Sequence, residues 1–205
     1  MVGYKYLRFH KGIHVNVNKG KRLPGEVLTP EEVQLLLASF PASRTGVRNR
    51  AIAALGLYAS LRCFEILNLY PGDIDLEKCS VLVRNGKGGK TARVGISRAA
   101  KPYIMEWREL RPESAQFFIC THKGEQVSTA YVREMLPRQS KKAGIRHRVH
   151  CHSFRHTSAV LLMRAGTPLV VISRQLRHSS IAVTNTYLQH VNPEEVISAV
   201  RDLIF

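Results

Sequence analysis

The 205-residue chain carries 31 lysines and arginines against 15 aspartates and glutamates, so its formal net charge is +16 and its isoelectric point is near 10.2. Neutralising phosphates releases the counterions condensed on a polyanion, and a charge of this size therefore favours a nucleic-acid partner. The alternative is an unspecific basic surface, as in ribosomal or chromatin proteins. The charge pattern argues against membrane-surface binding, because no long basic amphipathic helix stands out.

The sequence shows no sign of export or of membrane insertion. The first 25 residues contain six lysines and arginines and no apolar core segment. The longest apolar stretch, residues 51–59, is far too short to span a bilayer. Four scattered cysteines form no CxxC pair and predict reduced thiols in a cytoplasmic protein: Cys63, Cys79, Cys120 and Cys151.

The chain divides into a basic arm and one folded domain. Residues 1–28 contain no acidic residue before Glu26, and we interpret them as a mobile arm that can lie along DNA, with plain disorder as the alternative. The folded part, residues 29–205, begins at a helix start, where Thr29 is a capping residue, Pro30 occupies the first helical position and Glu32 completes a capping box. With 44% hydrophobic residues, the chain can bury one sizeable core.

Apolar periodicity predicts a mainly α-helical fold with one small antiparallel sheet. Two strands, 80–83 and 92–96, are joined by a glycine-rich hairpin tip at 85–90, and the apolar segment 117–120 is a candidate third strand. The remaining predicted elements are helices, over residues 48–58, from 62 to before Pro71, 99–110, 129–143, 153–164, 169–175, 181–188 and 193–203.

Two candidate functional features lie in the first half of the chain. Arg62 and Glu65 are three residues apart and share a helix face, although an ordinary surface ion pair has the same pattern. Lys87 lies at the glycine-rich tip, but Gly88 and a strand follow it instead of the Ser or Thr and helix of a Walker loop, so a nucleotide-binding loop is rejected. A lysine there can reach a phosphate or a leaving oxygen, or is simply solvated.

A third feature is the pair His152 and Arg155, which lie one helical turn apart and can both point at one phosphate from a helix start. The alternative is a zinc site. Arg155 lies among the candidate zinc ligands and would repel a cation, so we expect no metal there. The candidate zinc ligands are His150, Cys151, His152, His156, Cys120 and His122.

The fourth feature is His178 followed nine residues later by Tyr187. At about 100° per residue, this spacing places the two side chains on opposite faces of one continuous helix. They converge only if the helix begins after His178, and Ser179 or Ser180 would be a suitable cap. By itself, Tyr187 is equally well explained as a core or surface tyrosine.

Taken together, six residues in this order resemble the active-site signature of the tyrosine recombinase (phage integrase) family: Arg62, Lys87, His152, Arg155, His178 and Tyr187. The resemblance covers the chain from Leu28 onward. It is carried by the segments LTPEEVQLLL, SLRCFEILNL with GDIDLE, NGKGGKTARVGIS, HSFRHTSAVLLMRAG and LRHSSIAVTNTYLQH. It implies the catalytic-domain fold of that family and a site-specific DNA recombinase of the integrase or invertase type, without a metal or other cofactor.

The resemblance also implies a role for each residue. Tyr187 would attack the scissile phosphodiester to give a 3′-phosphotyrosine link and a free 5′-hydroxyl. Arg62 and Arg155 would stabilise the charge on the non-bridging oxygens, and Lys87 would protonate the departing 5′-oxygen. Because the covalent link preserves the energy of the phosphodiester, resealing needs no ATP.

The other implied roles concern positioning and assembly. His152 would assist as a base or a phosphate donor, His178 would hydrogen-bond the phosphate, and Glu65 would orient its neighbours. The implied partner is double-stranded DNA. The protein would be a monomer when free and would form a homo-tetramer on DNA. A separate clamping protein is a further option. The helix at 193–203 would pack on its own domain or on a neighbouring protomer.

Three departures from the family pattern stand out. Ser60 and Arg177 occupy positions where the family usually has glycine, and Arg177 adds charge near the site. In addition, 28 residues cannot hold the helical DNA-clamping domain of most relatives, so the chain resembles short members such as the fimbrial-switch invertases, or is an excised fragment. The competing functions are a type IB topoisomerase or telomere resolvase and a non-catalytic DNA-binding or regulatory module.

Overall fold

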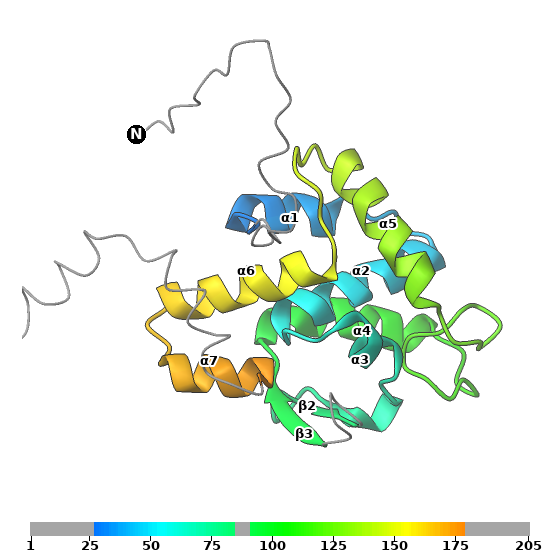
Figure 1. The fold of residues 1–205 in the computed structure, drawn as a ribbon. Helices are drawn as coiled ribbons and strands as arrows, with labels where there is room; N and C mark the ends of the chain where they lie inside the picture. Colours follow the sequence, from blue (N-terminus) through cyan, green and yellow to red (C-terminus); the bar gives the residue numbers. More distant parts are fainter. Residues whose placement is uncertain (1–26, 85–90, 179–205) are drawn as a thin grey trace, which may run out of the picture.

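The computed structural model describes residues 27–84 and 91–178, and these form helices packed around one central helix with a small sheet at one end (Figure 1). The central helix is α2 (Arg44–Tyr58), which packs against α4 (Lys101–Leu110) and α6 (Cys151–Arg164). The predicted class, mainly α with a small antiparallel sheet, is confirmed. Most of the predicted N-terminal arm, the hairpin tip at 85–90 and the predicted helices at 181–188 and 193–203 lie outside the described residues.

The first helix, α1 (Pro30–Ala38), has the predicted capping box. Thr29 Oγ1 accepts from the Glu32 N–H at 3.2 Å, and the Thr29 N–H donates to Glu32 Oε2 at 3.0 Å. Leu28, the last residue of the predicted arm, is 1% exposed, and its N–H donates to Thr157 Oγ1 of α6 at 2.9 Å. Core packing therefore already includes the residue before the cap.

Helix α2 begins at Arg44, four residues before the predicted start. Ser43 caps it, because its side chain accepts from the Gly46 N–H at 3.2 Å. The first turn of α2 begins with Arg44, Thr45 and Gly46, and apolar periodicity does not predict a turn of this composition. Farther along, α2 approaches α6 closely at a glycine: a Cβ added to Gly56 would lie 2.7 Å from Phe154 Cδ2.

The sheet has three antiparallel strands in the order β1-β2-β3, with β1 at Ile74–Asp75, β2 at Ser80–Val83 and β3 at Ala92–Gly95. Its third strand is therefore β1, and the prediction of a strand at 117–120 is wrong. Within that segment only Cys120 forms an isolated bridge, to Gln126. The segment is apolar because Phe118 and Ile119 are fully buried in the core, where the Phe118 carbonyl accepts from Trp107 Nε1 at 2.8 Å.

The other elements follow the predicted order with shifted ends. Helix α3 is only Cys63–Leu67, and a short 3-10 turn at Pro71–Asp73 follows it. A second 3-10 turn at Arg98–Ala100 precedes α4. The last described helices are α5 (Thr129–Lys142), α6 and α7 (Leu169–Leu176). None of the helices in the described ranges is long and apolar enough to cross a membrane.

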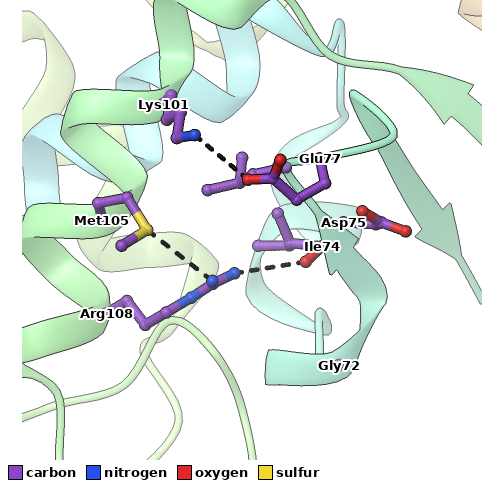
Figure 2. A pocket seen from close by; sticks show the side chains of 8 residues that line it. Gly72, Ile74, Asp75, Glu77, Lys101, Met105 and Arg108 are labelled. Atoms are coloured by element: carbon purple, nitrogen blue, oxygen red, sulfur yellow. Dashed lines mark hydrogen bonds and ion pairs between the residues drawn. The ribbon is translucent and has the colours of Figure 1, made fainter.

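One pocket of about 430 Å³ lies between α4 and residues 72–77, which include β1 (Figure 2). On its wall, Lys101 Nζ pairs with Glu77 Oε1 at 3.3 Å, and Arg108 Nη2 donates to the Ile74 carbonyl at 3.3 Å. None of the six candidate site residues lines it. Its charged groups tie α4 to the sheet.

The close approach of α2 and α6 gives a test of the packing. Gly56→Ala would place a methyl group against the buried Phe154 ring, and we expect a loss of about 1–2 kcal/mol in the free energy of unfolding, since overpacking outweighs the better helix propensity of alanine. Chemical denaturation measures the change. Gly72→Ala, where an added Cβ meets nothing within 4 Å, is the matched control. Equal stability of the two variants would contradict the packing described.

Candidate active site

Four of the six predicted site residues are described by the structure, and they come from three segments that are far apart in the sequence. Arg62 directly precedes α3, His152 and Arg155 lie in the first turns of α6, and His178 follows α7. Lys87 and Tyr187 lie outside the described residues.

Arg155 joins two of these segments. Its side chain is buried, with the residue 6% exposed. Nη1 donates to the Ser60 carbonyl at 2.6 Å, and Nη2 donates to the Leu176 carbonyl. Ser60 is two residues before Arg62, and Leu176 is two residues before His178. One guanidinium therefore holds the loop that carries Arg62 against the end of α7 that carries His178.

Arg62 is oriented by a buried carboxylate. Glu65 Oε1 accepts from Arg62 Nη1 at 2.8 Å, and Oε2 accepts from the Arg62 backbone N–H at 2.8 Å. The side chain of Arg62 is 29% exposed, whereas that of Glu65 is only 2% exposed. This geometry is that of a carboxylate positioning an arginine whose guanidinium still reaches the surface. It differs from the exposed ion pair that was the sequence-based alternative.

The charge state of Glu65 follows from its neighbours. Burial raises the pKa of this carboxyl, but the charges of Arg177 and Arg62 and the hydrogen bonds from Arg62 outweigh it and hold the pKa of Glu65 below its usual value. Glu65 is therefore ionised at neutral pH. An ionised carboxylate in this position keeps both arginines in place through charge-assisted hydrogen bonds.

His178 lies within this group of cations. Burial, followed by the charges of Arg155, Arg62, Arg177 and His156, lowers the pKa of His178 to about 4. Its backbone N–H donates to the Ser173 carbonyl at 3.1 Å, which fixes the turn at the end of α7. His178 is thus neutral at pH 7 and can donate or accept one hydrogen bond beside the arginines.

The two positions that depart from the family pattern, Ser60 and Arg177, both have left-handed backbone conformations, with φ of 54° and 53°. Glycine adopts this region freely, whereas another residue gives up about 1–2 kcal/mol there. Ser60 is held by a hydroxyl–hydroxyl hydrogen bond of 2.5 Å to Ser158 and by the bond from Arg155 to its carbonyl. The family preference for glycine thus has a conformational cause that this chain overcomes with contacts.

His152 is exposed in the first turn of α6, three residues before Arg155. The helix begins two residues before the predicted start, because His150 is its cap and accepts from the Ser153 N–H at 3.1 Å. Within 27–84 and 91–178, no three His, Cys, Asp or Glu side chains gather in a way that could hold a metal ion.

Sequence reasoning missed Gln175, which connects α7 to the sheet. Its Oε1 accepts from the Gly95 N–H at 2.9 Å, and its Nε2 donates to the Gly95 carbonyl at 2.8 Å and to the Ala59 carbonyl at 3.2 Å. The side-chain amide thus makes the same pair of hydrogen bonds with the Gly95 backbone that a neighbouring strand would make. A lone glutamine in an amphipathic helix carries no signal from which this contact could have been predicted.

The surroundings of His178 predict its titration. An NMR pH titration should give a midpoint well below the ordinary value of about 6.5, and near 4, with His178→Gln used to assign the resonance. Because the unfolded chain takes up this proton first, the contribution of His178 to stability is complete above pH 6.5 and falls as the pH drops towards 4. A midpoint at or above 6.5 would show that the arginines do not surround it.

The described domain is mainly helical and brings Arg62, Arg155 and a neutral His178 together from distant segments. A phosphate is the kind of group whose charge and acceptors suit such residues. The model of the phage integrase family matches residues 26–194. The chain belongs to the phage integrase family.

Individual relatives agree with this assignment. The chain is 33% identical over 165 residues to a tyrosine recombinase XerA of Thermococcus kodakarensis, an alignment that covers 79% of this chain and 57% of the relative. It is 30% identical over 183 residues to a tyrosine recombinase of Thermosipho africanus, which covers 89% of this chain and 63% of the relative. The chain therefore spans less than two thirds of the length of these relatives.

Solved structures agree as well. A crystal structure of XerA recombinase superposes with a TM-score of 0.76 at 25% identity, covering 92% of this chain and 69% of that chain. A XerH site-specific recombinase bound to a palindromic difH substrate in a post-cleavage complex gives 0.72 at 27% identity, covering 92% of this chain and 56% of that chain.

Proposed function

We propose that the chain is a site-specific DNA recombinase of the integrase or invertase type, which cleaves and rejoins DNA through a 3′-phosphotyrosine intermediate. The observation that carries this proposal is the bridge made by Arg155, which brings the segments of Arg62 and His178 to one place. Family membership supplies the chemistry expected there.

Double-stranded DNA is the proposed substrate. The net charge of +16 favours it, and the XerH relative is described as bound to its difH substrate. We propose a homo-tetramer on DNA, acting in the cytoplasm. A largely apolar pocket of about 450 Å³ between α2, α6, α7 and β3, with Leu161 and Val171 exposed beside it, offers a surface on which a neighbouring subunit would pack.

The two arginines would act differently. Arg155 is buried and donates to two backbone carbonyls. Its charge would therefore act on the phosphate across the protein interior, where the low dielectric constant strengthens electrostatic attraction. Arg62 is partly exposed and held from behind by Glu65, so it would donate directly to a non-bridging oxygen. His178, neutral in the free protein, would add a hydrogen bond to the same phosphate.

Two of the three residues that would take part in the bond changes, Tyr187 and Lys87, lie outside the described part of the chain. The Tyr187 oxygen would attack phosphorus, the bond to the 5′-oxygen would break, and Lys87 would give its proton to that oxygen. His152, exposed at the start of α6, would receive the proton of the Tyr187 hydroxyl. Resealing would reverse these transfers, so no phosphodiester is lost.

The nucleophile is tested with a nicked suicide duplex that contains a candidate site, in the presence of EDTA. We expect a covalent protein–DNA adduct for the natural chain and none for Tyr187→Phe, because the phenylalanine ring has no oxygen to attack phosphorus. Denaturing electrophoresis detects the adduct. A requirement for a divalent metal, or an adduct that persists in the variant, would falsify the mechanism.

The same assay separates the competing functions. A non-catalytic DNA-binding module would bind the duplex and form no adduct under any condition. A relaxing topoisomerase or telomere resolvase would form the adduct without exchanging strands between two duplexes. Exchange between two labelled duplexes is therefore the measurement specific to a recombinase.

Arg155 gives a second test, in which charge and geometry are separated. Arg155→Lys keeps the charge, but a single ammonium on a shorter reach cannot hold both carbonyls, so we expect cleavage to fall on the order of 100-fold or more. DNA affinity should change little, since many other basic residues contact the backbone.

The matched control is Arg164→Lys, an exposed position at the end of the same helix, which should leave cleavage unchanged. Arg155→Ala should in addition lower the melting temperature, because two buried carbonyls lose their donor. Normal cleavage by the lysine variant would show that the bridge is dispensable.

A further inference from the structure

We propose that Arg177 is a positioning residue of this site: it holds the Glu65 carboxylate that orients Arg62, and it ties that carboxylate to the turn that carries His178. The inference rests on the proposed function. It concerns a position at which the family usually has glycine, so it describes a feature that this chain adds to the common site.

The contacts of Arg177 lead directly to the catalytic arginine. Arg177 Nη2 pairs with Glu65 Oε2 at 2.5 Å, while the other oxygen of the same carboxylate accepts from Arg62 Nη1 at 2.8 Å. Arg177 Nη1 donates to the Gln175 carbonyl at 2.9 Å. The side chain of Arg177 is only 11% exposed and that of Glu65 only 2%. Glu65 is therefore a buried bridge between α7 and the segment of Arg62.

Arg177 also has features that oppose folding. Its backbone is left-handed, with φ of 53°. Its charge is desolvated, and burial lowers the pKa of Arg177 even though Glu65 opposes that change. Its Nε is buried and has no hydrogen-bond partner among the described residues. Each of these features is unfavourable for folding, and together they offset part of what the buried ion pair with Glu65 contributes.

The charge balance of the site indicates what Arg177 contributes to it. Arg62, Arg155 and Arg177 contribute three positive charges, and ionised Glu65 removes one. The remaining charge of this cluster, which does not include Lys87, is about +2, and positive charge here stabilises the negative charge that a phosphodiester develops when a fifth oxygen joins phosphorus. With glycine at position 177, the same site would hold about +1.

The first test compares Arg177→Gly with Arg174→Gln. The glycine variant restores the usual residue and relaxes the left-handed turn, so it should remain folded. In single-turnover cleavage of the suicide duplex we expect a loss of about 10- to 100-fold, because Arg62 loses its fixed orientation. DNA affinity should change by less than about threefold. Arg174→Gln removes the same charge from an exposed position on α7 and should leave the cleavage rate unchanged.

The second test asks whether the effect passes through Glu65. In a Glu65→Gln background, adding Arg177→Gly should cost little more cleavage activity, since the bridge is already broken. Arg177→Lys should recover part of the rate lost in the glycine variant, because the ammonium can still pair with the carboxylate. Independent, multiplicative losses in the double variant would overturn the positioning role.

A third readout does not depend on recombination. Arg177 is one of the charges that lower the pKa of His178, so Arg177→Gly should raise the NMR midpoint of His178, and Arg174→Gln should not. If the natural chain forms no adduct while this midpoint moves, the proposed function fails and the contact survives. An unmoved midpoint, full cleavage activity in the glycine variant, or equal losses of affinity in the Arg177 and Arg174 variants would each overturn the inference.

Discussion

The interaction on which the site depends is the bridge from the Arg155 guanidinium to the carbonyls of Ser60 and Leu176. A buried guanidinium is costly unless its donors are used, and the planar fork of arginine can satisfy two acceptors in different directions. Because these carbonyls belong to segments separated by more than a hundred residues, one side chain sets the distance between them. Lysine has no comparable geometry.

The rest of the fold keeps this bridge in place. The central helix α2 ends at Tyr58 just before Ser60, and it packs against α6 at Gly56 and Phe154, next to Arg155. On the other side, Gln175 joins α7 to the edge of β3, so the second acceptor cannot drift from the sheet. In the sequence, Lys87 lies between β2 and β3, and β3 is the strand that Gln175 joins to α7.

The sequence allowed the class of fold to be predicted, because helix caps such as Thr29 act locally. The six site residues were chosen by their family-like spacing, and their roles stay a prediction. The sequence did not allow the contacts to be predicted. The strand assigned to 117–120 was wrong because an apolar run is equally compatible with a buried loop, and Phe118 lies in such a loop. The bridge from Arg155 to two backbone carbonyls has no side-chain partner whose spacing could reveal it.

The left-handed turns at positions 60 and 177 combine a backbone cost with a gain in side-chain contacts. Glycine at positions 60 and 177 would satisfy the backbone at no steric cost, but it would contribute no charge and no hydroxyl. Here Ser60 gains a hydrogen bond to Ser158, and Arg177 gains a buried carboxylate partner. Both gains occur at the two turns whose neighbouring carbonyls Arg155 binds, so the extra contacts strengthen the bridge that orders the site. If Arg62 acts as proposed, an arginine held through such a chain of contacts would lose less entropy when the phosphate arrives, and pre-organisation of this kind would lower the barrier of a reaction that depends on placing charge.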